Sequence, residues 1–299
     1  MSNGAGTPNP RLEDLVKKIR KSECVLFVGS AIHAPPPDGS RFTYPEEVRP
    51  PLGPSLAKKL ADKCDYEKMF PGESVTNLQR VSLCFETGQP QGRAILMDKL
   101  DEYLRQKKEP SAALKMLASL PFKIIVTTNY DQLLETGLGL FNKKPSVFVY
   151  SSKLNEPTPD LATDPTVERP LLFKMHGDLD HRDSIVITDE DYITFIQRMS
   201  DKDALHPVPQ TVRYRMQRWW TLFVGYSLSD YNLRLLFRTL RWRVDPVDAP
   251  RTYSVDKRPD PLILKVWQDK MDLVTFVTQD IWTFLPWLYK EIHEKEYET

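Results

Sequence analysis

Four short polar segments hold the side chains of this sequence that could do chemistry, and each of them follows an apolar run. They are Gly29-Ser30-Ala31, Thr128-Asn129-Tyr130-Asp131, His176-Gly177 and Gly225-Tyr226-Ser227. An imidazole can accept a proton near neutral pH, and a carboxamide can donate one hydrogen bond while it accepts another. Small residues let the backbone approach a phosphate group closely. The pattern favours a site that binds a phosphorylated ligand and moves a proton on it.

The apolar runs before these segments have the composition of strands that are buried on both faces of a parallel sheet. The four runs cover residues 24–28, 122–126, 171–174 and 221–224; 251–255 predicts a fifth strand and 147–150 an edge strand. The carboxyl ends of parallel strands meet at one edge of a sheet, and ligands bind outside that edge. We therefore expect the four polar segments to converge on one site.

Helical patterns separate most of the predicted strands. Residues 12–19 and 281–293 have amphipathic spacing, the second interrupted at Pro286, and residues 55–118 predict a helical insertion between the first two strands. A Pro-rich loop over 34–54 precedes that insertion and could act as a lid. The sequence predicts one α/β domain over 1–299, with a Rossmann-like, doubly wound parallel sheet and the insertion within it.

The four segments, in this order along the chain, resemble the segments that form the nucleotide pocket of the sirtuin family. The resemblance implies an enzyme that breaks NAD at its nicotinamide–ribose bond, with Asn129 positioning the attacking group and His176 acting as base. It also implies NAD contacts from the following residues: Gly29, Ser30, Ala31, Thr128, Asp131, Gly225 and Ser227. Asp256, just after the fifth predicted strand, could accept hydrogen bonds from the adenosine ribose.

The chain also departs from the family's pattern. Ala31 stands where the phosphate loop has its second glycine, and His33 stands where the family has a serine. Protein-deacylating sirtuins hold zinc with two Cys pairs, whereas the three cysteines here form no Cys-x-x-Cys. These features resemble the sirtuin-like NAD hydrolases of bacterial anti-phage defence. That group implies an NAD glycohydrolase that releases nicotinamide and ADP-ribose, a homo-oligomer, and a partner such as a HerA-type DNA-translocating ATPase.

Other interpretations remain open at this point. The chain could be a non-catalytic NAD or ADP-ribose-binding subunit of an ATPase or nuclease, a protein deacylase, or an assembly subunit with a vestigial pocket. Asp131 could orient Asn129 and the ribose, or it could cap the helix that follows it. Ser229 or Asp230 could cap a helix over 233–240. His176 could be a structural histidine, and the acidic loop 176–183 also permits a metal-site interpretation.

The composition limits the remaining classes of function. Because 41 basic residues balance 41 acidic residues, no overall charge attracts nucleic acid. The arginines between 213 and 243 are interpreted as a solvated face or subunit contact, with a phosphate or nucleic-acid contact as the alternative. No apolar run approaches the ~20 residues that span a bilayer, and the N-terminus does not resemble a secretory signal. An odd number of cysteines, with no metal-ligand spacing, predicts neither disulfides nor zinc and fits the reducing cytoplasm.

Overall fold

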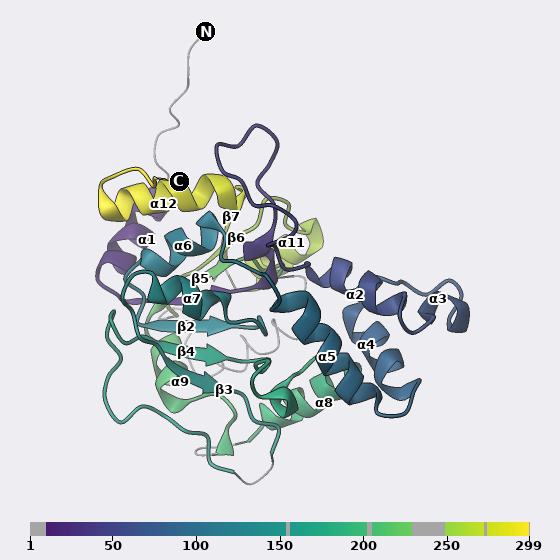
Figure 1. The fold of residues 1–299 in the computed structure, drawn as a ribbon. Helices are drawn as coiled ribbons and strands as arrows, with labels where there is room; N and C mark the ends of the chain where they lie inside the picture. The colour runs from purple at the N-terminus through teal and green to yellow at the C-terminus, as the bar shows by residue number, and fades with distance from the viewer. Residues whose placement is uncertain (1–9, 154–155, 202–204, 229–248, 272–273, 299) are drawn as a thin grey trace.

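The computed structural model describes residues 10–153, 156–201, 205–228, 249–271 and 274–298 (Figure 1). Within these residues the chain forms a seven-stranded sheet in the order β3-β4-β2-β1-β5-β6-β7. Each neighbouring pair is parallel. The strands are β1 (Cys24–Val28), β2 (Ile124–Thr127), β3 (Ser146–Val149), β4 (Leu171–Lys174), β5 (Trp220–Val224), β6 (Thr252–Val255) and β7 (Val274–Val277).

The strand order reverses at β1. The chain passes from β1 to β2 on one side, and later places β5 on the other side of β1. Loops that leave neighbouring strands in opposite directions open a crevice at such a switch point, and open α/β sheets bind ligands there. Gly29 follows β1 and Gly225 follows β5, so both glycine turns lie at this point of the sheet.

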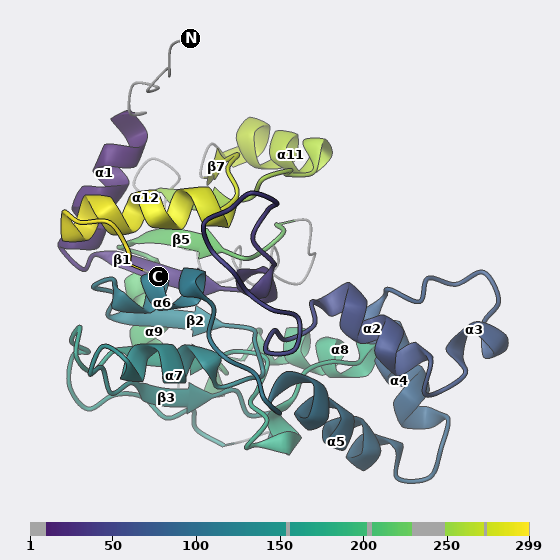
Figure 2. The same cartoon turned by 45° about the horizontal axis from the view of Figure 1, so that its top comes forward.

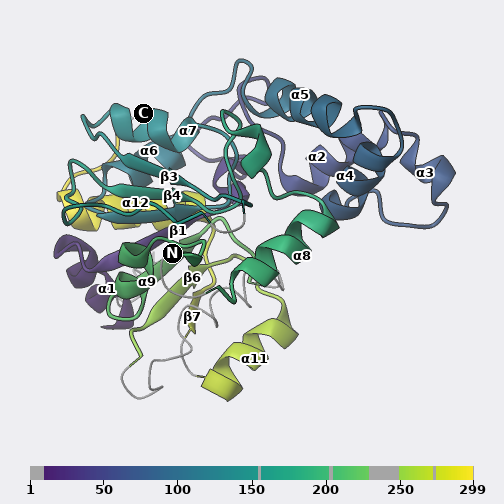
Figure 3. The ribbon, with the colours of Figure 1, turned by 90° about the horizontal axis from the view of Figure 1, so that it is seen from below.

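Alternate residues of each strand are buried on opposite faces, because side chains in a strand alternate in direction. In β1, Leu26 packs with one apolar cluster and Phe27 packs with the other. The first cluster is covered by α1 (Pro10–Arg20), α6 (Ala112–Ser119), α7 (Leu133–Gly139) and α12 (Ile281–His293). The second is covered by α8 (Asp189–Arg198), α9 (Gln210–Met216) and α11 (Pro261–Met271). Figure 3 shows helices on both sides of the sheet.

Four more helices stand apart from these layers, beyond the ends of the strands (Figures 1 and 2). They are α2 (Gly53–Ala61), α3 (Tyr66–Met69), α4 (Leu78–Thr87) and α5 (Gly92–Leu104), and we call residues 53–104 the helical segment. It has an apolar cluster of its own, which also includes Leu179, Ile185 and Ile187 from the loop after β4. Arg93 adds polar contacts, since it pairs with Asp191 at 2.8 Å and donates to the Ile185 carbonyl at 2.7 Å. The segment is therefore joined to the loop that carries His176.

The α/β fold class and the doubly wound parallel sheet are confirmed, whereas β7 and α11 were not predicted. The C-terminal helix was predicted to be interrupted at Pro286, but α12 runs through that residue. The predicted helix over 233–240, with its capping residues, lies outside the described residues. Within the predicted insertion 55–118, α6 packs on the sheet rather than on the helical segment, and the division into domains stays a prediction. No helix in the described part of the chain is long and apolar enough to cross a membrane.

Candidate active site

The two glycine turns at the switch point pack backbone against backbone. A Cβ atom at Gly29 would lie 2.4 Å from the Gly225 carbonyl oxygen and 2.9 Å from the Tyr226 ring. Gly225 itself has a φ of +77°, a conformation that side-chain-bearing residues rarely adopt, and a Cβ there would lie 2.6 Å from the Ile32 nitrogen. Both glycines are therefore required by the close approach of the β1 and β5 turns.

The turn after β1 uses several of its amides inside the protein. Gly29 N–H donates to the Val224 carbonyl at 2.9 Å, and Ala31 N–H donates to the Gly225 carbonyl at 3.0 Å. A short 3-10 helix, Ser30–His33, begins here. Of the predicted nucleotide contacts in this turn, Ser30 lines the cavity described below, whereas Gly29 and Ala31 are not among its lining residues.

The segment after β2 is anchored before it reaches Asn129. The Thr127 hydroxyl donates to the Val28 carbonyl at 2.8 Å and accepts the Asn129 N–H at 3.1 Å. Asp131 accepts the Leu133 N–H at 2.9 Å, at the start of α7. Asp131 therefore contacts the first turn from the position before the N-cap, which is Gln132, and it is not the capping residue itself. The contacts of its second oxygen bear on the other sequence interpretation.

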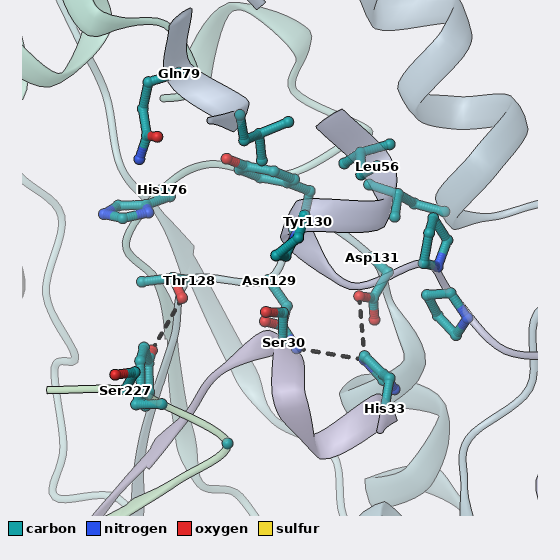
Figure 4. Close-up of a pocket in the computed structure, with 18 of the residues that line it drawn as sticks. Ser30, His33, Leu56, Gln79, Thr128, Asn129, Tyr130, Asp131, His176 and Ser227 are labelled. Atoms are coloured by element: carbon teal, nitrogen blue, oxygen red, sulfur yellow. Dashed lines mark hydrogen bonds and ion pairs between the residues drawn. The ribbon is translucent and has the colours of Figure 1, made fainter. Parts of the chain in front are cut away.

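His33 lies between Asn129 and Asp131. Its Nε2 is 3.4 Å from Asn129 Nδ2 and 3.5 Å from Asp131 Oδ2, and the residue is buried (Figure 4). Burial alone would raise the pKa of the Asp131 carboxyl, but His33 and the Leu133 N–H together with Lys174 lower it below its usual value. Asn129 Oδ1 is also buried, and it has no hydrogen-bond partner within the described residues. This oxygen is therefore an unsatisfied buried acceptor beside the cavity.

The pair His176-Gly177 forms the turn after β4. Gly177 has a φ of +91°, and a Cβ atom there would lie 2.3 Å from the Ser184 carbonyl oxygen. The loop returns at this point, where Val186 N–H donates to the His176 carbonyl at 3.0 Å. The glycine of this pair therefore permits a tight loop that holds the imidazole at the end of β4.

His176 is enclosed by aromatic side chains. The Tyr192 and Phe195 rings each meet it edge-on with ring centroids 5.2 Å apart, and Tyr192 Oη lies 3.4 Å from Nδ1. Burial lowers the pKa of His176 to about 3, because few polar groups replace the water that would solvate an imidazolium. The ring is therefore neutral at physiological pH, which is the form that accepts a proton.

The depressed pKa of His176 predicts a pH-dependent contribution to stability. Between the unfolded pKa of 6.5 and the folded pKa of about 3, the unfolded chain binds more protons at this site, so stability falls as the pH falls. Relative to His176→Gln, the wild-type chain should lose about 2 kcal/mol of unfolding free energy between pH 7.5 and pH 5. Urea denaturation of both proteins at the two pH values measures this difference. Parallel losses in the two proteins would contradict the assigned burial.

The polar segments meet in one cavity of about 490 Å³, a volume in the usual range for small-molecule sites. Seven of the ten predicted site residues line it: Ser30, Thr128, Asn129, Asp131, His176, Gly225 and Ser227. Asp256 does not line it; its carboxylate accepts the Arg258 N–H at 2.9 Å. The contribution of Gly29, Ala31 and Asp256 to nucleotide binding stays a prediction.

Part of the cavity wall was not expected from the sequence. The helical segment and the loop before it contribute Pro50, Pro51, Gly53, Pro54, Leu56, Thr76, Leu78, Gln79 and Leu104. The Pro-rich loop 34–54 was predicted as a lid, and its last residues do border the cavity. Tyr192 and Phe195 from α8 complete the surroundings of His176. These residues come from distant parts of the sequence and share no motif with the polar segments.

A buried lysine joins the two loops that carry Asn129 and His176. Lys174, the last residue of β4, is fully buried. Its ammonium group donates to the Asp131 carbonyl at 2.6 Å and to Glu135 at 3.0 Å, and it also pairs with Asp178. Asp178 in turn accepts from Gln132 at 2.9 Å. Lys174, Glu135 and Asp178 therefore form a buried ionic network, and Gln132 adds a hydrogen bond to it.

Within the described residues, no group of three or more His, Cys, Asp or Glu side chains is placed to hold a metal ion. His181, from the loop that permitted a metal-site interpretation, is exposed, whereas His176 is buried.

Comparison with known proteins agrees with this geometry. The family model for the SIR2-like domain matches residues 123–274, about half of the chain. The chain belongs to the SIR2-like family. Residues 123–274 include the Asn129 segment, His176 and the turn after β5, so the matched region contains most of the polar groups in the cavity.

Several curated relatives are also similar to this SIR2-like chain. It is 34% identical to the NAD(+) hydrolase ThsA of Enterococcus faecium over 148 residues, which are 50% of this chain and 28% of that protein. It is 26% identical to ThsA of Bacillus cereus over 255 residues, which are 84% of this chain and 47% of that protein. Defense-associated sirtuin 2 of Bacillus subtilis is 25% identical over 152 residues, 13% of its length. The matches thus cover less than half of each relative.

Proposed function

We propose that this SIR2-like chain hydrolyses NAD at its nicotinamide–ribose bond and releases nicotinamide and ADP-ribose. The observation that carries the proposal is the pairing of two acceptors in one cavity. Asn129 presents a buried Oδ1 that lacks a partner within the described residues, and His176 presents a neutral imidazole. Ser30 and Ser227 line the same cavity and could hold phosphate oxygens. Relatives named NAD(+) hydrolase support the choice of substrate.

The reaction that we propose needs little acid catalysis. The nicotinamide ring is cationic, so when the C–N bond breaks, its electron pair neutralises the ring nitrogen and the leaving group departs uncharged. The ribose carbon becomes electron-deficient, and a water molecule bonds to it. That water becomes acidic as the bond forms, and the neutral His176 accepts its proton. Asn129 Oδ1 would hold the water or a ribose hydroxyl in line with the reacting carbon.

The cavity supports this chemistry by shielding His176 from bulk water. The aromatic edges of Tyr192 and Phe195 cover His176, and electrostatic interactions are stronger where water is absent. The Asp131 carboxyl lies behind Asn129, with its pKa lowered and its charge next to His33. Its negative charge would favour an electron-deficient ribose in the cavity, because opposite charges attract more strongly in a buried site.

Incubation of the purified chain with NAD tests the proposal, with nicotinamide and ADP-ribose separated by chromatography. The proposed function predicts the two products in equal amounts. Thermal stabilisation by NAD without product release would instead favour the regulatory binding subunit.

We also propose that the activity depletes cellular NAD in anti-phage defence; the Bacillus subtilis relative is named as defence-associated. The proposed place of action is the reducing cytoplasm, where the NAD pool would be consumed. The homo-oligomer and the HerA-type ATPase partner remain part of the proposal. Light scattering of the chain alone, and then with such an ATPase, would measure both associations.

A further inference from the structure

Arginine and aromatic side chains gather where β5 and β6 begin, at the edge of the sheet opposite to the cavity. Trp220 is the first residue of β5, Trp219 precedes it, and Arg251 precedes β6. Because β1, β5 and β6 run parallel, their first residues share one edge, whereas the helical segment lies beyond the other edge (Figure 1). We call the following residues the amino-edge patch: Tyr214, Arg215, Arg218, Trp219, Trp220 and Arg251.

The end of α9 and the loop after it place guanidinium groups over aromatic rings. The Arg218 guanidinium carbon lies 3.7 Å from the centroid of the Tyr214 ring, and Arg218 also donates to the Tyr214 carbonyl at 3.2 Å. The Arg215 guanidinium carbon lies 5.5 Å from the centroid of Tyr214 and 4.6 Å from that of Trp219. These contacts hold long, flexible side chains in place, so less conformational entropy is lost when a ligand binds them.

A second stack extends the patch to the other face of the sheet. Trp219 packs with the apolar cluster that contains Phe27, whereas Trp220 packs with the opposite cluster. The Arg251 guanidinium carbon lies 5.4 Å from the centroid of the Trp220 ring, which also stacks on Tyr253. The patch therefore reaches around the edge of the sheet, with a cation beside an aromatic ring on both faces.

Two arginines of the patch are available to an anion. Arg218 and Arg251 are exposed, and within the described residues neither of them pairs with a carboxylate. Tyr214 beside Arg218 is 48% exposed, so its ring is also accessible. Arg215 differs from these two arginines, because it pairs with Asp164 at 2.8 Å. The exposed part of the patch therefore combines unneutralised cations with an accessible aromatic face.

The acidic residue at the start of β1 does not cancel this charge. Glu23 adjoins the patch, since its carbonyl accepts the Trp220 N–H at 3.2 Å. Its carboxylate is paired with Lys18 at 2.7 Å. This hydrogen bond and the charges of Lys18, Lys21 and Lys123 lower the pKa of Glu23 below its usual value. Three lysines thus surround the single carboxylate, and they add to the positive charge of this edge.

We propose that the amino-edge patch binds single-stranded nucleic acid. Guanidinium groups pair with phosphates, and aromatic and guanidinium planes stack on bases of any sequence. An unpaired strand presents both its phosphates and its base faces, whereas a duplex buries the faces between its base pairs. The zero net charge of the chain does not oppose this binding, because screening limits exposed charges to about 8 Å at physiological salt. A strand bound here leaves the cavity at the other edge open.

Fluorescence anisotropy with a labelled oligothymidylate tests this proposal without NAD. Tyr214→Ala should weaken binding about tenfold, because a stacked base loses its platform. Arg218→Ala should weaken binding about threefold to tenfold and lower the slope of log affinity against log salt concentration by about 0.7, the share of one phosphate contact. Arg41→Ala is the matched control, with an effect within about twofold. Arg41 is also exposed and lies 4.9 Å from the centroid of Phe42, but it belongs to the Pro-rich loop after β1.

The same titration defines the results that would overturn the proposal. Binding that is absent from the wild-type chain, or equal in the wild type and both patch variants, would show that the patch holds no nucleic acid. Equal affinity for a duplex of the same length would show that bases are not stacked. Light scattering tests the subunit contact: a smaller assembly in the variants with unchanged oligonucleotide binding would assign the patch to a contact between copies. Circular dichroism establishes that the variants are folded.

Discussion

His176→Ala is expected to lower the rate of nicotinamide release from NAD by about 10²–10⁴-fold, the usual contribution of a positioned acid–base group. The substitution removes the imidazole that would accept the water proton. It also opens a space beside Tyr192 and Phe195, so the measurement should include the unfolding free energy and the thermal shift produced by NAD. Retention of that shift would show that binding survives while chemistry is lost.

His181→Ala serves as the matched control for that substitution. His181 belongs to the same loop but is exposed and does not line the cavity, so its loss should leave turnover within about twofold. Because the pKa of His176 is about 3, the free wild-type enzyme should show no acid limb from this residue between pH 5 and pH 8. Full turnover by His176→Ala would show that another group accepts the proton.

Lys174→Met should reduce the unfolding free energy by about 3–5 kcal/mol, since it removes one partner of a buried ionic network. Lys174 is fully buried, and the substitution would leave Glu135 and Asp178 with uncompensated charges. Burial already raises the pKa of Glu135, an effect that Lys174 partly offsets. Urea denaturation near neutral pH measures the loss. Activity should also fall, because Lys174 joins the loops of Asn129 and His176.

Lys99→Met gives the comparison for this prediction. Lys99 pairs with Glu102 at 2.6 Å, but both side chains are substantially exposed, and such pairs contribute little to stability. Adding Asp178→Asn to Lys174→Met should recover part of the lost stability, because it removes one of the unpaired charges. The account of the network would be wrong if Lys174→Met cost no more than Lys99→Met.

The sequence was sufficient to predict six of the seven strands and the edge of the sheet at which the polar segments meet. Short apolar runs followed by polar residues identify β1, β2, β4 and β5, because strands buried on both faces leave little room for polar side chains. The common edge then follows from the parallel direction of these strands. β7 was missed, although Val274–Val277 has three β-branched residues and a phenylalanine, because a run this short can equally belong to a buried helix.

The rest of the site depends on contacts between distant residues. Gln79 and Leu56 reach the cavity only because the helical segment packs on the loop after β4 through Leu179, Ile185 and Ile187. No periodicity in the sequence encodes that docking. His33 counted as a departure from the family pattern, yet the fold places its ring beside Asn129 and Asp131. Gly29 was predicted to let the backbone approach a phosphate group. In the structure its lack of a side chain also lets the Gly225 backbone pack against it.

Nicotinamide release from NAD, measured for the wild-type chain beside Asn129→Ala, tests the central claim most directly. The proposed function predicts steady release by the wild type, with ADP-ribose in equal amount, and a loss of about 10²-fold or more in the variant. Circular dichroism and NAD-induced thermal shifts establish that the variant is folded. Equal release by the two proteins would contradict the role of Asn129, and stabilisation by NAD with no release from the wild type would contradict hydrolysis by this chain.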